Sequence, residues 1–355
     1  MTRAEKLRAK IAPFADAIVI TDVLNQYYIS GFRFTDGYVL VTQKGAHIVT
    51  DFRYVEAAQR LAPAGFEIVT PARGAEMATY MRDVCAREGV KTVAFEEARI
   101  TYAEHEKLKD ALGVDFVTSR GVIEQMRRVK DKEEVDKMCA AQKITDDAFT
   151  HILSVITPEM TEIEVATELE YFMRKHGGED KSFDTICVSG SASSLPHGVP
   201  RNRKLERGFL TMDYGCIVDG YHSDMTRTVC IGKADEEMKR LYNTVLKAQV
   251  SAIEGAKVGM KCAAVDAIAR DIIEDAGYHG AFGHSLGHSV GLEIHEAPNF
   301  APRSADFFEN GHVITVEPGI YLAGKYGCRI EDMVWAHDDT VTSLTHSPKE
   351  LIELF

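Results

Sequence analysis

The sequence predicts an α+β protein in which a smaller α/β domain precedes a larger domain of long helices on a curved sheet. The chain has 355 residues, which is enough for about two domains. Its first third alternates short apolar runs with amphipathic stretches. The remainder carries long β-rich runs that are separated from long helical stretches. We expect one domain over residues 1–126 and a second over residues 127–355.

Four apolar runs of the first domain are expected to form strands, because they are rich in β-branched residues. These runs are residues 16–22, 37–42, 46–51 and 91–97. Gly45 lies between the second and third runs, where it favours a tight hairpin turn. Residues 76–89 have helical spacing and end in a glycine. A second helix is expected over residues 101–113, which open with the capping-box pair Thr101 and Glu104.

The second domain opens with the mixed-charge run RRVKDKEEVDK at residues 127–137. Such a run is typical of the solvated face of a helix that is entered from a linker. Asp131 and Glu134 within it form an N-terminal capping pair, so a long helix is expected to begin there.

Two more helices and three β-rich runs are expected in the second domain. Thr161 and Glu164 repeat the capping pattern, and their helix is expected to end at Gly177-Gly178. Residues 261–277 have amphipathic spacing and a terminal glycine. The β-rich runs are residues 183–190, 208–232 and 312–322. Strand runs that are separate from long helices predict helices packed on a curved sheet.

Composition excludes several classes of function. The net charge of −13 opposes electrostatic binding to nucleic acid or to anionic membranes. No apolar run approaches the roughly 18 residues that a membrane-spanning helix needs, and the N-terminus has no secretion signal. The seven cysteines are scattered and form no C-x-x-C pair, which indicates a reducing compartment. We therefore expect a cytoplasmic protein without nucleic-acid or membrane partners.

Two aspartates in the longest β-rich run predict a cation site. Asp219-Gly220 is a strong turn signal, and a turn centred there places Thr226 opposite Asp213. Asp224 lies two positions from Thr226 and therefore shares a face with Asp213, at a separation of about 7–8 Å at most. Carboxylates that are buried on one face repel each other unless a cation lies between them. The alternative is that both aspartates are exposed strand residues.

A second acidic pair lies in apolar, β-rich surroundings, where an unpaired carboxylate is costly. Glu317 lies in VITVEPGIYL and Glu331 in CRIEDMVWA, although either glutamate alone is also compatible with a surface or salt-bridge role. Four carboxylates and one imidazole carry four negative charges, which two divalent cations neutralise. Oxygen-rich donor sets with one imidazole suit manganese, cobalt or iron. Paired ions about 3.5–4 Å apart are a standard arrangement in hydrolases.

The stretch GHSLGHSVGLEIHE permits two interpretations. GHSLG and GHSVG match the nucleophile elbow of serine hydrolases. Three histidines favour a metal site instead: His284, His288 and His295. An elbow needs a strand before the motif and a helix after it, whereas the residues before it are poor strand formers and the glycines after it weaken a helix. A triad of Ser285, Asp332 and His346 has no other support in the sequence.

The ordered motifs DYGCIVDGYHSDMTRT, GHSVGLEIHE, EPGIY and RIED resemble the metallopeptidase family of proline peptidases and methionine aminopeptidases, which has the pita-bread fold. The resemblance is strongest to Xaa-Pro aminopeptidases and Xaa-Pro dipeptidases, and it covers about residues 125–355. The segment before it resembles the N-terminal domain of creatinase through YYISGF and its α/β pattern. This additional domain argues against a methionine aminopeptidase. Creatinase itself shares the scaffold but lacks the metal ligands.

The resemblance implies a dinuclear metal site with five ligands, namely Asp213, Asp224, His288, Glu317 and Glu331. In such a site Asp213 chelates one ion, His288 and Glu317 complete the other, and Asp224 and Glu331 bridge both. A hydroxide that bridges the ions attacks the scissile carbonyl, and Glu317 shuttles the proton to the leaving nitrogen. Manganese is the expected metal, with cobalt, zinc and iron as alternatives.

The resemblance also assigns roles to five residues outside the ligand set. His197 and His295 match histidines that bind substrate and stabilise the oxyanion. His284 matches a histidine of the proline-specific branch of the family. Tyr321 and Arg329 match positions that flank the ligands, and Arg329 is expected to orient a carboxylate.

The implied function is a metal-dependent exopeptidase that cleaves the bond before proline, in longer peptides or in Xaa-Pro dipeptides. Such bonds resist general peptidases because proline has a fixed φ and no N–H. The expected partners are peptides with proline at the second position and a second copy of the chain in a homodimer. A non-catalytic binding module on the same fold is the alternative, but such relatives have usually lost ligands that this chain retains. Ser289 stands where the family most often has glycine, and its small side chain is expected to leave metal binding intact.

Overall fold

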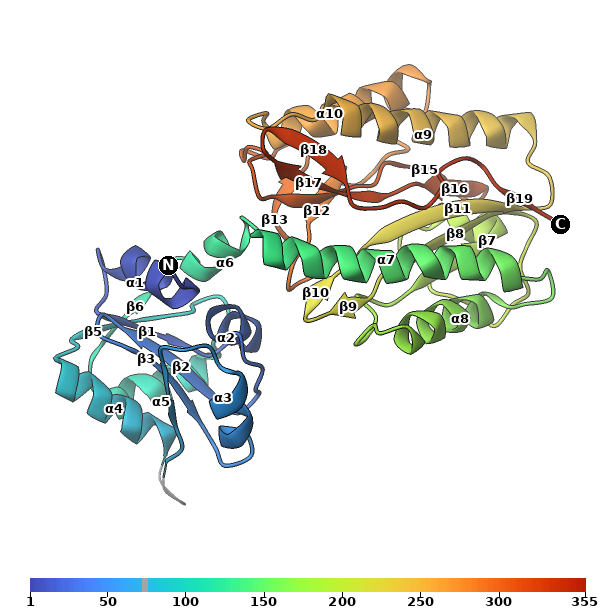
Figure 1. Ribbon diagram of the computed structural model, residues 1–355. Coiled ribbons are helices and arrows are strands. Elements are labelled where there is room, and N and C mark those ends of the chain that lie inside the picture. Colours follow the sequence, from blue (N-terminus) through green and yellow to red (C-terminus); the bar gives the residue numbers. More distant parts are fainter. Residues whose placement is uncertain (72–75) are drawn as a thin grey trace. The chain divides into compact units, whose positions relative to one another are not determined.

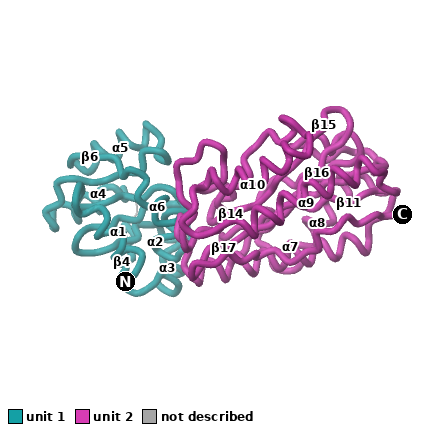
Figure 2. The backbone as a smooth tube through the Cα atoms, turned by 90° about the horizontal axis from the view of Figure 1, so that it is seen from above, with its two compact units in different colours: residues 1–127 teal, residues 128–355 magenta. Residues whose placement is uncertain are grey.

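The computed structural model describes residues 1–71 and 76–355. It divides into two compact units, Met1–Arg127 and Arg128–Phe355, which Figure 2 colours separately. Among the described residues, no helix is both long and apolar enough to span a membrane.

The first unit is built on a six-stranded mixed sheet in the order β4-β3-β2-β1-β5-β6. Its strands are β1 Ala17–Ile20, β2 Gly37–Thr42, β3 Ala46–Thr50, β4 Phe66–Val69, β5 Thr92–Phe95 and β6 Asp115–Thr118. Its helices are α1 Arg3–Ile11, α2 Val23–Ser30, α3 Val55–Leu61, α4 Met77–Glu88, α5 Tyr102–Leu112 and α6 Val122–Arg127. The four strands and two helices that the sequence predicts here are confirmed, whereas β4, β6 and the four other helices are not anticipated.

The capping pairs that the sequence predicts are fully formed at α7 (Lys132–Val155) and at α8 (Glu162–Lys175), and half formed at α5. The Asp131 carboxylate accepts the N–H of Glu134, and the Glu134 carboxylate accepts the N–H of Asp131. At α5 the Thr101 hydroxyl accepts the N–H of Glu104, but the Glu104 carboxylate accepts the hydroxyl of Tyr38 at 3.2 Å. The second half of that box is replaced because the sheet supplies a competing donor.

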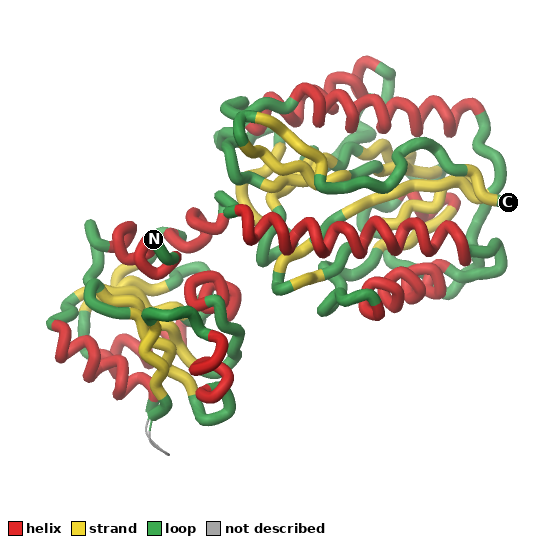
Figure 3. Tube along the Cα trace, in the orientation of Figure 1, coloured by secondary structure: helices red, strands yellow, loops and turns green. Residues whose placement is uncertain are grey.

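The second unit places two helix pairs on opposite sides of its strands (Figures 1 and 3). The pairs are α7 with α8 (Glu162–Lys175), and α9 (Glu236–Gly255) with α10 (Cys262–Asp275). Each pair is joined by a connection of equal length, residues 156–161 in the first and 256–261 in the second. The sequence predicts α7, α8 and α10 but not α9, although Asp235 caps α9 by accepting the N–H of Met238.

The strands of this unit form two larger sheets and two short ribbons. The four-stranded sheet contains β19 Glu353–Leu354, β11 Met225–Ile231, β8 Gly208–Tyr214 and β7 Ile186–Ser189. The five-stranded sheet contains β13 Glu296–Phe300, β12 Gly287–Ser289, β14 Val313–Val316, β17 Asp332–His337 and β18 Thr340–Ser343. The ribbons are β9 Ile217–Val218 with β10 Tyr221–His222, and β15 Gly319–Leu322 with β16 Tyr326–Arg329. Buried side chains of α7 and α8 share one core with β8 and β11, and those of α9 and α10 share another with β14 and β17.

The hairpin register that the sequence predicts is confirmed. Thr226 on β11 pairs with Asp213 on β8. The turn residues Asp219 and Gly220 have φ values of 48° and 80°, a left-handed pair that Asp-Gly adopts at low cost. This register brings the two aspartates to the same end of the sheet.

The solvated face that the sequence predicts for residues 127–137 is wrong at three charged positions. Arg127, Lys130 and Glu134 are only 2%, 4% and 2% exposed. The guanidinium of Arg127 donates to Oδ1 of Asn25 at 2.9 Å in the first unit. Glu134 accepts a hydrogen bond of 2.9 Å from the hydroxyl of Tyr221, and Lys130 forms an ion pair of 3.0 Å with Glu296. Each of these buried charges therefore has a specific partner, which a pattern of alternating charge does not reveal.

A buried arginine joins the centre of the second unit to its C-terminal segment. The Arg227 guanidinium uses all five of its N–H donors, which bond four backbone carbonyls and one carboxylate. The acceptors are Thr226 O, Glu331 O, Ser347 O, Pro348 O and Asp332 Oδ1, at 2.6–3.0 Å. The other oxygen of Asp332 accepts from Lys349 Nζ at 2.5 Å.

The C-terminal segment is also tied to α7. The carboxylate of Asp146 accepts the N–H of Ser347 at 2.8 Å and its hydroxyl at 2.5 Å. The N–H of His346 donates to the same carboxylate at 3.1 Å. These bonds join residues that lie 200 or 201 positions apart in the sequence.

Candidate metal centre and active site

The five residues that the sequence nominates as metal ligands come together from five segments of the second unit. Asp213 lies on β8, Asp224 directly precedes β11 and His288 lies on β12. Glu317 directly follows β14, and Glu331 lies in the short link between β16 and β17. All five side chains line one cavity of about 820 Å³.

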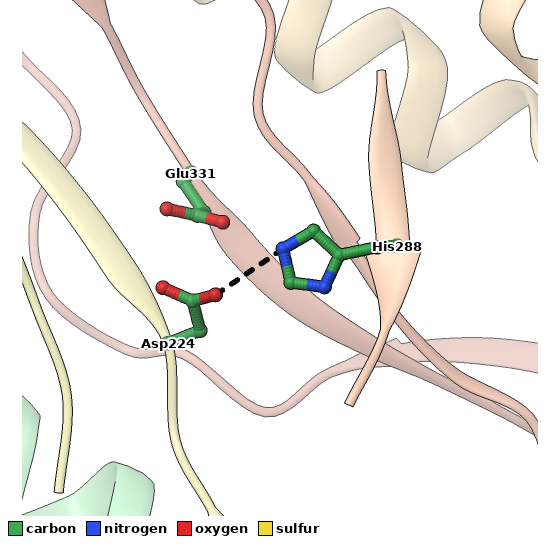
Figure 4. Close-up of side chains that lie close together, drawn as sticks. All are labelled: Asp224, His288 and Glu331. Atoms are coloured by element: carbon green, nitrogen blue, oxygen red, sulfur yellow. Dashed lines mark ion pairs between the residues drawn. The ribbon is translucent and has the colours of Figure 1, made fainter. Parts of the chain in front are cut away.

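Three of these side chains converge closely. Asp224, His288 and Glu331 each offer a ligand atom within 4.8 Å of the other two, and Figure 4 shows the side chains pointing toward a common point. Nε2 of His288 lies 3.5 Å from an oxygen of Asp224 and 3.5 Å from an oxygen of Glu317. These separations exceed an ordinary hydrogen bond and match two ligands that each bind one ion at about 2.1 Å.

The carboxylates of the cavity are electrostatically unfavourable without a cation. Burial, followed by the charges of Asp213 and Glu317, raises the pKa of Asp224 well above its usual value. Burial and then Asp224 raise the pKa of Glu331 in the same way, and burial raises the pKa of Glu317 to about 8. Oδ1 of Asp213 is buried and has no hydrogen-bond partner among the residues that the structure describes. The donor set therefore fits divalent cations, which would satisfy that oxygen and relieve the repulsion.

Two threonines orient the glutamates, and neither is expected as a functional residue from the sequence. The Thr226 hydroxyl donates to Oε2 of Glu331 at 2.7 Å. The Thr315 hydroxyl lies 3.3 Å from Oε1 of Glu317 and accepts the N–H of His288 at 3.1 Å. A signal was present in both cases, because Thr226 is predicted to lie opposite Asp213 and Thr315 shares a strand face with Glu317.

Arg329 links Asp213 to two residues that the sequence places beside the ligands. Its guanidinium donates to Oδ2 of Asp213 at 2.6 Å and to the hydroxyl of Tyr321 at 2.7 Å. That hydroxyl lies 3.0 Å from Nε2 of His284. Burial raises the pKa of Tyr321 to about 12, so the hydroxyl keeps its proton. Arg329 and His284 line the cavity, whereas Tyr321 lies behind them.

Burial disfavours the charged form of three histidines of the cavity. Burial and then His295 lower the pKa of His288 to about 4, and burial and then Arg329 lower that of His284 to about 4. Burial and then His197 lower the pKa of His295. The rings of His288 and His295 lie 4.4 Å apart, and His197 lines the same cavity. Neutral imidazoles can bind a metal or donate a hydrogen bond.

The serine-hydrolase interpretation of the glycine-rich stretch has no support in this geometry. Ser289 is fully buried, and its hydroxyl donates to the carbonyl of Val313 at 2.9 Å. Asp332 of the hypothetical triad is engaged by Arg227 and by Lys349. Ser289 is also not among the described residues that line the cavity. The expectation that its side chain leaves metal binding intact is consistent with this position.

We expect the metal-free protein to lose stability between pH 7 and pH 8. Folding raises the pKa of Asp224, Glu317 and Glu331, so the folded chain binds more protons than the unfolded chain over this interval. The stability that these groups contribute is present at low pH and is lost as the pH rises through their folded values. Above pH 7 the buried histidines contribute little, because unfolded histidines are already neutral there.

Thermal unfolding of chelator-treated protein at the two pH values measures this loss. With saturating Mn²⁺ the protein should instead be more stable at pH 8 than at pH 7, because metal binds only the deprotonated carboxylates. Glu331→Gln should weaken the pH dependence of the metal-free protein. A metal-free protein that becomes more stable from pH 7 to pH 8 would contradict the prediction.

Comparisons with known proteins agree with this geometry. A profile of metallopeptidase family M24 matches residues 136–338, and one of the creatinase/prolidase N-terminal domain matches residues 3–129. The Xaa-Pro dipeptidase of Pyrococcus horikoshii is 37% identical to the chain, over 95% of this chain and 94% of its own length.

Solved structures extend the likeness to both units. The Xaa-Pro dipeptidase from Bacillus anthracis is 41% identical, with a TM-score of 0.95 over 99% of each chain. The X-Pro aminopeptidase from Thermotoga maritima is 35% identical, with a TM-score of 0.93 over 99% of this chain and 100% of that chain. The family resemblance and the fold class that the motifs predict are thereby confirmed. The chain belongs to metallopeptidase family M24 and carries a creatinase/prolidase N-terminal domain.

Proposed function

We propose that this protein is a metal-dependent exopeptidase that hydrolyses the bond before proline in Xaa-Pro peptides. The observation that carries the proposal is the convergence of four carboxylates and one imidazole on a single cavity of the second unit. The names of similar family members, an Xaa-Pro dipeptidase and an X-Pro aminopeptidase, support the choice of substrate. The proposal assigns the chemistry to residues 127–355, since every residue of the site lies there.

The ligand set suits two divalent ions, held by Asp213, Asp224, His288, Glu317 and Glu331. Hard oxygen donors with one imidazole favour Mn²⁺, with Co²⁺, Zn²⁺ or Fe²⁺ as alternatives. When bound, such ions supply a water of lowered pKa as the nucleophile and draw charge from the scissile carbonyl. The threonine and arginine contacts described above fix the carboxylates before substrate arrives.

The chain itself supplies the proton transfer and the stabilisation of the oxyanion. Glu317, which lines the cavity with an oxygen 3.5 Å from Nε2 of His288, is suited to accept a proton from the attacking water and deliver it to the proline nitrogen. His295 and His197 line the cavity and would donate hydrogen bonds to the oxyanion. His284 would contact the substrate from the end of the Arg329–Tyr321–His284 chain.

A site that recognises proline needs apolar contacts for the pyrrolidine ring. It needs no hydrogen-bond acceptor at the proline nitrogen, because that nitrogen carries no hydrogen. The cavity offers apolar side chains beyond the ligands, namely Phe183, Ile186, Val199 and Ile294. These residues are candidates to contact the pyrrolidine ring.

The test is hydrolysis of Ala-Pro and Ala-Pro-Pro by metal-stripped protein, with and without added Mn²⁺. We expect cleavage only with metal and none of Ala-Ala, whose second residue keeps its N–H. Cleavage of Ala-Pro alone defines a dipeptidase, and cleavage of the tripeptide defines an aminopeptidase. Binding of both peptides without cleavage under Mn²⁺ or Co²⁺ would favour a non-catalytic binding module.

We also propose that the protein acts as a cytoplasmic homodimer. The family resemblance implies the dimer, and light scattering of the purified protein measures its mass. All seven cysteines are free thiols, which supports a reducing compartment.

A further inference from the structure

His295 lies at the end of an irregular turn. Residues 290–295 join β12, which carries His288, to β13, which begins at Glu296. The register of the two strands shifts between His288 and Ser289. Regular ladder bonds therefore do not fix His295, and a side chain that must meet a transition state needs another support.

The carboxylate of Glu296 folds back across this turn. Its Oε1 accepts the N–H of Glu293 at 3.2 Å. It also lies against Gly291, where an added Cβ would come within 2.6 Å of Oε2. Gly291 in turn donates its N–H to the carbonyl of Glu293 at 3.0 Å and accepts the N–H of His222 at 2.9 Å. Glu296 thus closes the turn through its side chain.

Lys130 also binds that carboxylate. Nζ of Lys130 lies 3.0 Å from Oε2 of Glu296, and the two side chains are only 1% and 7% exposed. The backbone of Lys130 is fixed as well, because its N–H donates to the carbonyl of Gly311 at 2.8 Å. A desolvated, charge-assisted bond of this kind is directional and is weakly screened by salt.

We propose that Lys130 and Glu296 are positioning residues that hold His295 for its contact with the oxyanion. Glu296 follows His295 directly in the chain, so any displacement of its backbone moves the histidine. A displacement of about 1 Å at a reacting group can cost about 100-fold in rate. This inference rests on the proposed function of His295 and adds two residues to it.

Two substitutions disturb the pair differently. Glu296→Gln removes the charge but keeps an acceptor for Glu293, and Gly291→Ala keeps both charges but forces the carboxylate aside. Each should lower kcat about 10- to 100-fold, as is usual for residues that orient a catalytic group, with metal content unchanged. Gly283→Ala is the matched control, because a Cβ at Gly283 has no described atom within 4 Å.

Lys130→Met should lower kcat in the same way, because it leaves the Glu296 carboxylate buried without its cation. Its control is Lys132→Met, two positions further along, where the side chain is 71% exposed. Equal kcat values for the Lys130 and Lys132 variants would overturn the role of Lys130.

The decisive measurement is a double-mutant cycle with His295→Ala. If Glu296 acts through His295, Glu296→Gln should lower kcat in the natural background and have no further effect in the His295→Ala background. The proposal would be overturned if Glu296→Gln lowered kcat by the same factor in both backgrounds. It would also be overturned if Glu296→Gln and Gly291→Ala both kept the kcat of the unsubstituted protein. Loss of folded protein in both variants, seen by circular dichroism, would make the pair a stability element and also overturn it. A His295→Ala enzyme with undiminished kcat would instead refute the proposed role of His295 itself.

Discussion

Replacement of Glu331 by glutamine should abolish peptide hydrolysis, with a loss in kcat of about 1000-fold or more, the upper range for a group that stabilises a transition state. Glutamine has nearly the same shape and keeps an oxygen that can accept from Thr226, so the fold should survive. It carries no charge, however, and the site would then offer two cations only three carboxylates. Because Glu331 is 1% exposed, water cannot replace the missing charge.

Metal analysis of dialysed protein, kcat with saturating Mn²⁺ and circular dichroism together test this expectation. Glu133→Gln is the matched control, since that side chain on α7 is 78% exposed. Bound metal should fall in the Glu331 variant and stay unchanged in the control. A folded Glu331→Gln protein with normal metal content and turnover would remove Glu331 from the ligand set.

Replacement of Arg227 by methionine should destabilise the protein by about 3–5 kcal/mol, the usual cost of removing one partner of a buried ion pair. The change leaves Asp332 buried with Lys349 as its remaining cation. It also removes one donor from each of four carbonyls, among them that of Glu331.

Urea unfolding of the metal-free protein measures this loss. The double variant Arg227→Met with Asp332→Asn should recover part of it, because the buried carboxylate is then neutral. If the single variant unfolds at the same urea concentration as the natural protein, the buried network contributes no net stability.

The sequence brings the five candidate ligands to one cavity because each lies on a strand or directly beside one. The Asp-Gly turn fixes which residue faces Asp213, and the strand period of two then places Asp224. Glu317 and Glu331 are also easy to identify, because each lies in an apolar run that is long enough to predict a buried strand. The order of the motifs indicates the family, and the family resemblance implies the roles of His197, His284 and His295.

Other features depend on contacts between segments that no local pattern connects. Lys130 lies in a run whose alternating charges are typical of a surface, yet its partner Glu296 is 166 positions away. Glu104 has the spacing of a capping residue, but its carboxylate accepts a hydrogen bond from the hydroxyl of Tyr38 on the sheet. The hydroxyls that orient the glutamates belong to Thr226 and Thr315. Threonine is common in strands, so its presence there gives no sign of a functional role.

The bonds from Asp146 to Ser347 have a consequence for the order in which the protein matures during synthesis. At a ribosomal rate of about 5–20 residues per second, Asp146 would be translated roughly 10–40 s before Ser347. Throughout this delay α7 lacks the segment that satisfies its buried carboxylate, and Arg227 lacks two of its acceptors. The first unit, Met1–Arg127, is translated before this delay begins. The nascent second unit is therefore the part that a chaperone would be expected to shield until translation has passed its final strand.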